Sequence, residues 1–201
     1  NSTNAFTLTT AGTVKVATQN PFQINTGLSY YFDGTGDYLT TADNPSLELS
    51  GGNFTIECWI FPTSSAAQQI IINKVATQSV VGSYDLRLNT SGTLQFFAAS
   101  ASGVTWAVNS TTTGTVSFNS WNHVAYVRNT GGVFTVYING TSAGTTTNNI
   151  TLVDETTTTN IGANGNGTSP FTGYMSDIRI TKGVARYTTT FTPPTTPLVT
   201  R

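Results

Sequence analysis

The chain has 201 residues, of which 37% are apolar and 8% are charged, and its 8 basic and 9 acidic residues give a net charge of −1. This length fits one all-β domain, and the apolar fraction is too high for a chain kept disordered by charge. The near-neutral balance, without a basic run, argues against a nucleic-acid partner. The sequence also contains no apolar stretch that would form a membrane segment.

Cysteine usage and the two chain ends add little about function. Cys58 is the one cysteine, so no disulfide can form within the chain, and its apolar surroundings predict a small buried side chain. The sequence begins at Asn1 without a signal peptide, and we expect both ends to continue into a longer protein.

Residues 1–26 are polar and rich in threonine and asparagine. Alternation around Phe6–Leu8 and Thr13–Val16 allows one or two short strands before the turn at Asn20-Pro21. We interpret this segment as a lead-in or linker that packs on the body or on a neighbouring chain. The body itself is expected to span residues 27–191.

The first strong strands lie between residues 28 and 62. Tyr30 and Phe32 alternate with polar neighbours, and Gly34 and Gly36 suit a tight turn. The stretch Phe54–Phe61 then alternates along a strand, because successive side chains point to opposite faces. Its predicted inward residues are Phe54, Ile56, Cys58 and Ile60, and its outward residues are Thr55, Glu57, Trp59 and Phe61.

A second hairpin is predicted in the middle of the chain. Tyr84, Leu86 and Leu88 share one face, and Asn89–Gly92 suits the turn to a return strand bearing Leu94, Phe96 and Ala98. The opposite face then carries Asp85, Arg87, Gln95 and Phe97. A further strand is predicted at Val104–Val108.

The stretch Trp121–Gly140 predicts the central hairpin, with the four-residue loop Asn129–Gly132. Placing Arg128 opposite Val133 sets Val127 opposite Phe134 and Ala125 opposite Val136. In this register the core face of the hairpin carries His123, Ala125, Val127, Phe134, Val136 and Ile138. The other face carries Asn122, Val124, Tyr126, Thr135 and Tyr137.

The rest of the chain is richer in loops. Residues 141–160 predict a strand with long loops, and a glycine-rich loop runs from Ile161 to Pro170. After residue 181 the chain reads as extended, and we expect residues 192–201 to be a Pro/Thr-rich linker.

Several motifs together resemble the laminin-G-like branch of the concanavalin-A-type lectins and glucanases. They are Phe32-Asp33-Gly34 with Asp37-Tyr38, then Phe54–Ile60, Trp121–Ala125, Val136–Gly140 and Phe171–Ile180, in that order. The resemblance runs from about Tyr30 to Phe191. It implies an all-β, two-sheet antiparallel jelly-roll β-sandwich, and the stretch GVARYTTTFTPP resembles such modules in the virion proteins of marine bacteriophages.

In this fold we expect roughly a dozen strands. The residues predicted to be buried between the sheets are Phe54, Ile56, Ile60, Leu86, Leu88, Leu94, Phe96, Ala125, Val127, Phe134, Val136 and Ile138.

The resemblance also implies a structural Ca²⁺ ion. The family frequently holds calcium with carboxylates and backbone carbonyls, the oxygen ligands that a hard cation requires. The matching candidates are Asp33 and Asp177, with Asp37 as a third ligand. The alternative is that Asp33 caps a turn and that Asp177 pairs with Arg179 or Lys182.

The acidic residues do not favour glycoside hydrolysis, which needs a pair of cooperating carboxyl groups. Glu57 is alone on its strand, Glu48 lies near a turn, and Asp154 and Glu155 point to opposite faces if extended. The one histidine, His123, is predicted to face the core. We therefore expect no enzyme activity.

A shallow sugar site needs an exposed aromatic ring beside polar side chains that can bond hydroxyl groups. We expect Trp59 and Phe97 to be the rings and Glu57 and Arg87 to be their polar partners; Asp85 and the pair Tyr126 and Tyr137 are further candidates. The alternative is that loops cover these aromatic side chains.

Two functions follow from the sequence. One is a non-catalytic glycan-binding or adhesion module of a larger surface or virion protein, located outside the cell or on the virion surface. The other is a purely structural module that neighbouring copies or domains hold in an assembly through its edges and apolar patches.

Overall fold

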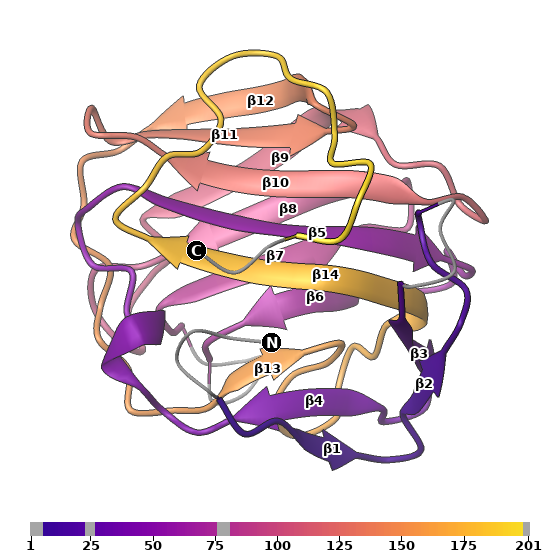
Figure 1. Ribbon diagram of the computed structural model, residues 1–201. Helices are drawn as coiled ribbons and strands as arrows, with labels where there is room; N and C mark the ends of the chain where they lie inside the picture. Colours follow the sequence, from indigo (N-terminus) through magenta and orange to yellow (C-terminus); the bar gives the residue numbers. More distant parts are fainter. Residues whose placement is uncertain (1–5, 23–26, 76–80, 199–201) are drawn as a thin grey trace.

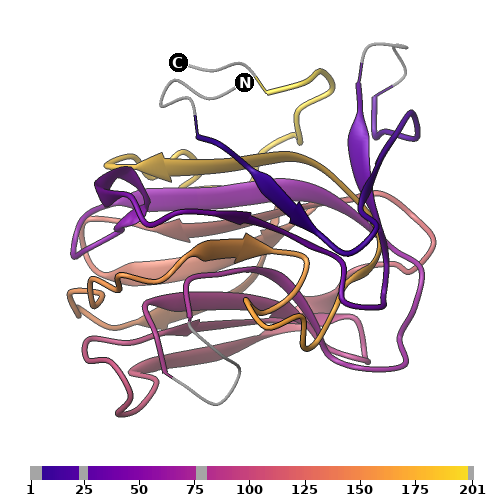
Figure 2. The same cartoon turned by 90° about the horizontal axis from the view of Figure 1, so that it is seen from below.

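The computed structural model describes residues 6–22, 27–75 and 81–198, which form two seven-stranded sheets packed face to face (Figures 1 and 2). Every strand pairing is antiparallel. The predicted all-β sandwich is therefore confirmed. None of the described segments is a helix long and apolar enough to cross a membrane.

We call the two layers the front sheet and the back sheet, as they lie in Figure 1. The front sheet has the order β12 (Thr141–Thr147), β11 (Val133–Ile138), β10 (Asn122–Arg128), β5 (Phe54–Pro62), β14 (Thr172–Lys182), β3 (Ser29–Asp33) and β2 (Lys15–Ala17). The back sheet has the order β1 (Thr9–Ala11), β4 (Tyr38–Thr41), β13 (Thr159–Ile161), β6 (Gln69–Asn73), β7 (Tyr84–Leu88), β8 (Thr93–Ala98) and β9 (Val108–Thr115). A short 3₁₀ turn, η1, spans Pro45–Leu47.

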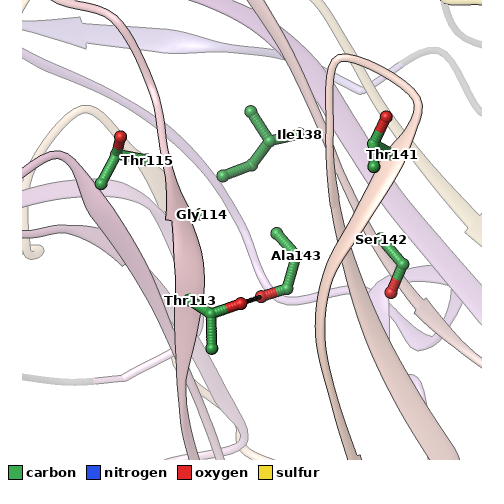
Figure 3. Close-up of a pocket in the computed structure, with 7 residues that line it drawn as sticks. All are labelled: Thr113, Gly114, Thr115, Ile138, Thr141, Ser142 and Ala143. Atoms are coloured by element: carbon green, nitrogen blue, oxygen red, sulfur yellow. Dashed lines mark hydrogen bonds between the residues drawn. The ribbon is translucent and has the colours of Figure 1, made fainter.

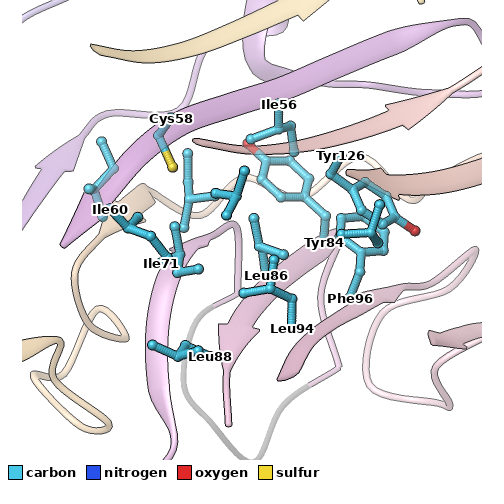
Figure 4. Packing of buried hydrophobic residues seen from close by; sticks show 14 of the residues in the cluster. Ile56, Cys58, Ile60, Ile71, Tyr84, Leu86, Leu88, Leu94, Phe96 and Tyr126 are labelled. Atoms are coloured by element: carbon cyan, nitrogen blue, oxygen red, sulfur yellow. The ribbon is translucent and has the colours of Figure 1, made fainter. Parts of the chain in front are cut away.

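The space between the sheets is filled by the alternate apolar residues of both layers (Figure 4). On β5 the inward side chains are Phe54, Ile56, Cys58 and Ile60, each at most 1% exposed. The predicted inward residues of β7 and β8 meet them, and the ring of Phe96 stacks on a ring from β10. Period-2 alternation therefore predicted this part of the core correctly.

The central hairpin has a different register from the predicted one. The amide of Asn129 donates to the carbonyl of Val133 (3.0 Å), so the loop has three residues, with Gly132 at φ 69°. A three-residue loop that ends in a left-handed residue is a common hairpin connection. Arg128 consequently lies opposite Phe134 instead of Val133.

A one-residue slip turns a whole strand over. Val124 and Tyr126 of β10 therefore belong to the core between the sheets. Ala125 and Val127 are buried as predicted, but on the outer face of the front sheet. His123 is likewise on this outer face, opposite Trp59. The predicted inward residues of β11 are correct.

The segment after β14 covers part of that outer face, along the yellow path in Figure 1. The rings of Tyr187 and Phe191 stack at 3.6 Å and pack on Ala125, Val127 and Tyr137. The predicted linker, residues 192–201, begins directly after Phe191. Its residues 192–198 are described by the structure, and residues 199–201 lie outside the described residues.

The start of the described chain joins both sheets. β1 pairs with β4 in the back sheet, and β2 pairs with β3 in the front sheet. Residues 1–5 and 23–26 of the predicted lead-in lie outside the described residues. The strand predicted at Val104–Val108 is wrong for its first four residues, because β9 begins at Val108 and continues through a threonine tract at the sheet edge.

Candidate functional site

The four predicted sugar-binding residues lie on opposite sides of the molecule. Trp59 and Glu57 project from β5 on the outer face of the front sheet, whereas Arg87 and Phe97 project from β7 and β8 on the outer face of the back sheet. The structure therefore places Phe97 in contact with Arg87 and places Trp59 on the same strand face as Glu57, but it does not bring the two pairs together.

Glu57 is fully buried beneath the C-terminal segment. Its Oε1 accepts from Nε and Nη2 of Arg179 (2.9 and 2.7 Å), and its Oε2 accepts from the hydroxyl of Tyr187 (2.7 Å) and lies 3.3 Å from Nε2 of His123. Burial alone would raise the pKa of Glu57, but hydrogen bonds from His123, Tyr187 and Arg179 outweigh it and lower the pKa. This carboxylate binds the C-terminal segment to β5.

Trp59 is half-buried beside this cluster. Its ring makes edge contacts with Phe22 (6.2 Å) and His123 (5.2 Å), and His123 in turn contacts Phe191. Aromatic neighbours therefore hold Trp59 in place on two sides. Of the other aromatic pair considered, Tyr126 lies in the core and Tyr137 lies under Tyr187.

The outer face of the back sheet carries a second polar and aromatic group, which we call the back-sheet cluster: Gln68, Arg87, Gln95, Phe97, Trp106 and Asn109. The guanidinium carbon of Arg87 lies 4.9 Å from the ring centre of Phe97, within the range of a cation–π contact. The ring centres of Trp106 and Phe97 are 5.3 Å apart. Phe97 is only 8% exposed, whereas Trp106 is half-exposed.

Amide side chains continue this cluster in a chain of hydrogen bonds. Nη1 of Arg87 donates to Gln68 (2.9 Å), Gln68 donates to Gln95 (3.2 Å), and Gln95 donates to Asn109 (3.3 Å). Each amide presents both a donor and an acceptor. The cluster therefore places a half-exposed indole ring beside several groups that can exchange hydrogen bonds with hydroxyl groups.

Asp85 fixes the position of the guanidinium from below. It is fully buried and accepts from Nε (2.9 Å) and Nη2 (2.5 Å) of Arg87, and burial raises its pKa. Both donors bond the same oxygen, Oδ2, and two bonds from one edge of the guanidinium fix its orientation. Asp85 therefore orients Arg87 over Phe97 instead of facing solvent.

The carboxylates proposed for calcium do not fit a shared ion. Asp33 lies opposite Thr172 in the β3–β14 register, whereas Asp177 lies five residues further along β14, roughly 16 Å away. Asp177 instead occupies a bulge at φ 49°. Burial raises its pKa.

Asp33 and Asp37 do lie together, but hydrogen-bond donors occupy their oxygens. Asp37 accepts from the amides of Thr13 and Asp33, and Asp33 accepts from the amide of Thr35 and the hydroxyl of Thr13. Calcium takes about 6–8 oxygen ligands. Among the described residues, no group of three or more His, Cys, Asp or Glu side chains could hold a metal ion.

A cavity of about 300 Å³ opens where the edge strands β9 and β12 meet (Figure 3). The hydroxyl of Thr113 donates to the carbonyl of Ala143 across this seam (3.1 Å). The lining residues are small or uncharged: Thr113, Gly114, Thr115, Ile138, Thr141, Ser142 and Ala143. They provide no group for acid–base chemistry.

Trp106 is the residue of the back-sheet cluster that sequence reasoning misassigned. It was placed inside a predicted strand, whereas it lies in the loop before β9. The sequence signal that could have identified it is a lone tryptophan in the polar stretch Ser100–Ser110.

Comparison with known families agrees with the architecture. The family model for the concanavalin A-like lectin/glucanase superfamily matches residues 33–186. The chain belongs to this superfamily. The predicted resemblance is therefore confirmed at the level of the family. No curated protein sequence matches this member of the superfamily significantly.

Solved structures show the same fold at low sequence identity. The binding domain of Paraclostridial Mosquitocidal Protein 1 is similar with a TM-score of 0.70 and 17% identity, over 91% of this chain and 45% of that one. Domain 4 of an extracellular arabinanase from Geobacillus stearothermophilus, in complex with arabinotriose, is similar with a TM-score of 0.65 and 19% identity, over 90% of this chain and 83% of that one. A putative carbohydrate-binding protein from Bacteroides ovatus is similar with a TM-score of 0.61 and 22% identity, over 79% of this chain and 44% of that one. The chain thus spans less than half of two of these three proteins.

Proposed function

We propose that this chain is a non-catalytic glycan-binding module of a larger surface or virion structural protein, and that it acts outside the cell or on the virion surface. The observation that carries this proposal is the back-sheet cluster, where the half-exposed ring of Trp106 contacts Phe97, and Phe97 in turn contacts Arg87, from which a chain of amide side chains begins. Two of the similar structures, the arabinotriose complex and the Bacteroides protein, support a carbohydrate ligand.

The chemistry of the cluster suits a sugar. An aromatic face takes the apolar side of a pyranose or furanose ring, and amide and guanidinium groups take its hydroxyls. Because such a site is shallow, we expect a Kd of roughly micromolar to millimolar for one site. Several copies on one particle would raise the overall avidity without a new contact.

The acidic residues near the outer faces support binding without cleavage. Glycoside hydrolysis needs one carboxyl group as an acid and another as a base or nucleophile. Glu57 is engaged by Arg179 and Tyr187, and Asp85 is engaged by Arg87. Both are fully buried, so they act as structural partners of arginine.

The proposal is tested with the domain displayed in many copies on a glycan array, followed by titration of the monovalent domain. Trp106→Ala is expected to weaken binding about tenfold or more, which corresponds to roughly 1.4 kcal/mol, and Trp106→Phe is expected to retain most of the affinity. Trp59→Ala is the matched control, because it removes the same side chain from the opposite sheet.

The outcomes separate the two candidate functions. Loss of binding in Trp106→Ala but not in Trp59→Ala supports the back-sheet site. If Trp59→Ala abolishes binding in a folded protein, the site lies on the front sheet instead. If the multivalent display binds no glycan, the module is structural and its partners are neighbouring copies or domains.

A further inference from the structure

A row of four aromatic rings crosses the front sheet beyond the cluster around Glu57. We call it the aromatic row: Trp121, Phe61, Tyr174 and Tyr31. The ring centres of Trp121 and Phe61 are 5.6 Å apart, those of Phe61 and Tyr174 are 5.9 Å apart, and those of Tyr174 and Tyr31 are 5.0 Å apart. All four side chains are partly exposed.

The strand register produces this row. Tyr174 of β14 lies opposite Phe61 of β5 on one side and opposite Tyr31 of β3 on the other. Trp121 immediately precedes β10, which pairs with β5. Directly opposed residues share a face, so the four rings follow one another across the sheet for three strand spacings, or roughly 14 Å.

Polar groups run alongside the rings. Asp33 lies opposite Thr172, and the amide of Thr63 donates to the carbonyl of Thr172 (2.9 Å). Thr63, Thr172 and Asp33 therefore form a second line of residues across β5, β14 and β3. Lys15 on β2 is exposed and lies opposite Tyr31, at the end of the row. One lysine and one aspartate give the border no net charge.

The two rings of the C-terminal segment cover a different part of the front sheet. These rings, Tyr187 and Phe191, contact His123 and Tyr137 on β10 and β11. The aromatic row lies toward β14 and β3, where Tyr174 contacts Phe61 and Tyr31.

We propose that the aromatic row is a second binding site, which takes a stretch of an uncharged linear polysaccharide. Consecutive rings along roughly 14 Å suit several sugar units in succession instead of a single one. The adjoining threonine hydroxyls supply hydrogen bonds to sugar hydroxyls, and the balanced border charge gives no preference for an anionic chain. The same polar line interrupts the apolar surface that an apolar protein partner would bury.

The test uses the whole chain in affinity gels that contain one soluble polysaccharide: hydroxyethyl cellulose, arabinoxylan or galactomannan, with heparin as the charged comparison. We expect retardation by at least one neutral polymer and tighter binding of its trisaccharide than of its monosaccharide. Trp121→Ala and Tyr174→Ala should each weaken binding of that polymer tenfold or more, whereas Tyr174→Phe should retain it.

Thermal unfolding shows whether each variant folds, and Tyr31→Ala at the other end of the row replaces any variant that does not. Retention of polymer binding in folded Trp121→Ala, Tyr174→Ala and Tyr31→Ala proteins overturns the proposal. Equal or stronger retardation by heparin overturns the assignment to an uncharged chain, and the absence of retardation by all three neutral polymers overturns the site.

Amide shift mapping with the bound trisaccharide distinguishes this site from the back-sheet cluster. Shifts around Tyr174 that persist in Trp106→Ala support the aromatic row independently of the proposed function. Shifts confined to the surroundings of Trp106, and lost in Trp106→Ala, support the back-sheet site and refute the row.

Discussion

Replacement of Glu57 by glutamine tests whether this residue holds the C-terminal segment or binds a ligand. The carboxylate is fully buried and accepts three hydrogen bonds, at 2.9, 2.7 and 2.7 Å, from Arg179 and Tyr187. Glu57→Gln keeps the volume but removes the negative charge that faces the guanidinium of Arg179. Breaking a buried ion pair from one side costs roughly 3–5 kcal/mol. For a chain of this size the melting temperature would fall by roughly 6–20 °C.

The assay is urea and thermal unfolding, with glycan binding measured on the same preparations. Tyr187→Phe is the smaller matched change, because it removes one hydrogen bond to the carboxylate at a cost of roughly 1.5–3 kcal/mol. The double variant should lose less than the sum of the two, since both changes remove the same contact. If Glu57→Gln is as stable as the wild type, the structural role assigned to Glu57 is refuted.

The pH dependence gives a second check on the same residue. The folded pKa of Glu57 is lowered from its ordinary value of 4.5, because hydrogen bonds from His123, Tyr187 and Arg179 outweigh the raising effect of burial. Its contribution to stability is therefore complete above pH 4.5 and disappears as the pH falls through the folded pKa. Below pH 4.5 the wild type should lose more stability than Glu57→Gln.

Two further predictions concern the backbone and the buried acid Glu48. Gly140→Ala should destabilise the domain more than Gly36→Ala and should increase proteolysis after residue 183. Both glycines have a positive φ (79° and 74°), a conformation that costs about 1–2 kcal/mol for a residue with a side chain. A Cβ at Gly140 would also overlap the carbonyl of Phe191, whereas a Cβ at Gly36 would meet no atom. Equal losses in the two variants would contradict the contact with Phe191. Burial raises the pKa of Glu48 to about 7 despite its ion pair with Lys74 (2.8 Å), so its carboxyl should titrate near pH 7 by NMR. Glu48 loses its proton at a lower pH in the unfolded chain than in the folded chain. The stability of the wild type relative to Glu48→Gln should therefore fall as the pH rises from 4.5 to about 7. A titration midpoint near 4.5 in the folded protein would refute this.

The inward face of β5, β7 and β8 could be predicted from the strong alternation of apolar side chains along each strand. Because the face toward the core must be apolar, that alternation leaves only one orientation of each strand. The strand β10 lacked that constraint. Val124 and Tyr126 alternate with Ala125 and Val127, so both of its faces are apolar, and only the loop geometry at Gly132 decides the register.

The apolar second face of β10 has a physical cause that no local pattern reveals. Ala125 and Val127 are covered by Tyr187 and Phe191, which lie some sixty residues further along the chain. The same covering segment surrounds Glu57, which the sequence had presented as an outward polar residue on a strand. Sequence periodicity assigns a residue to a face, but it does not show which distant segment lies over that face.

Sites on the outer faces were predictable only one residue at a time. Arg87 and Phe97 were correctly assigned to one face, because their strands form a tight hairpin in which Arg87 lies opposite Gln95 and Asp85 lies opposite Phe97. The alignment of Phe61, Tyr174 and Tyr31 depends on pairings between strands far apart in the sequence. Such a row becomes visible only when the order of strands in the sheet is known.

The position of β5 between β10 and β14 has a consequence for how the chain matures on the ribosome. Arg179, which binds Glu57 of β5, is synthesised 122 residues after it. At about 5–20 residues per second, this interval lasts roughly 6–24 s. During that time one edge of β5 has no strand partner, and its apolar side chains must be protected from other chains. The final strand and the segment that follows it therefore complete the sheet last.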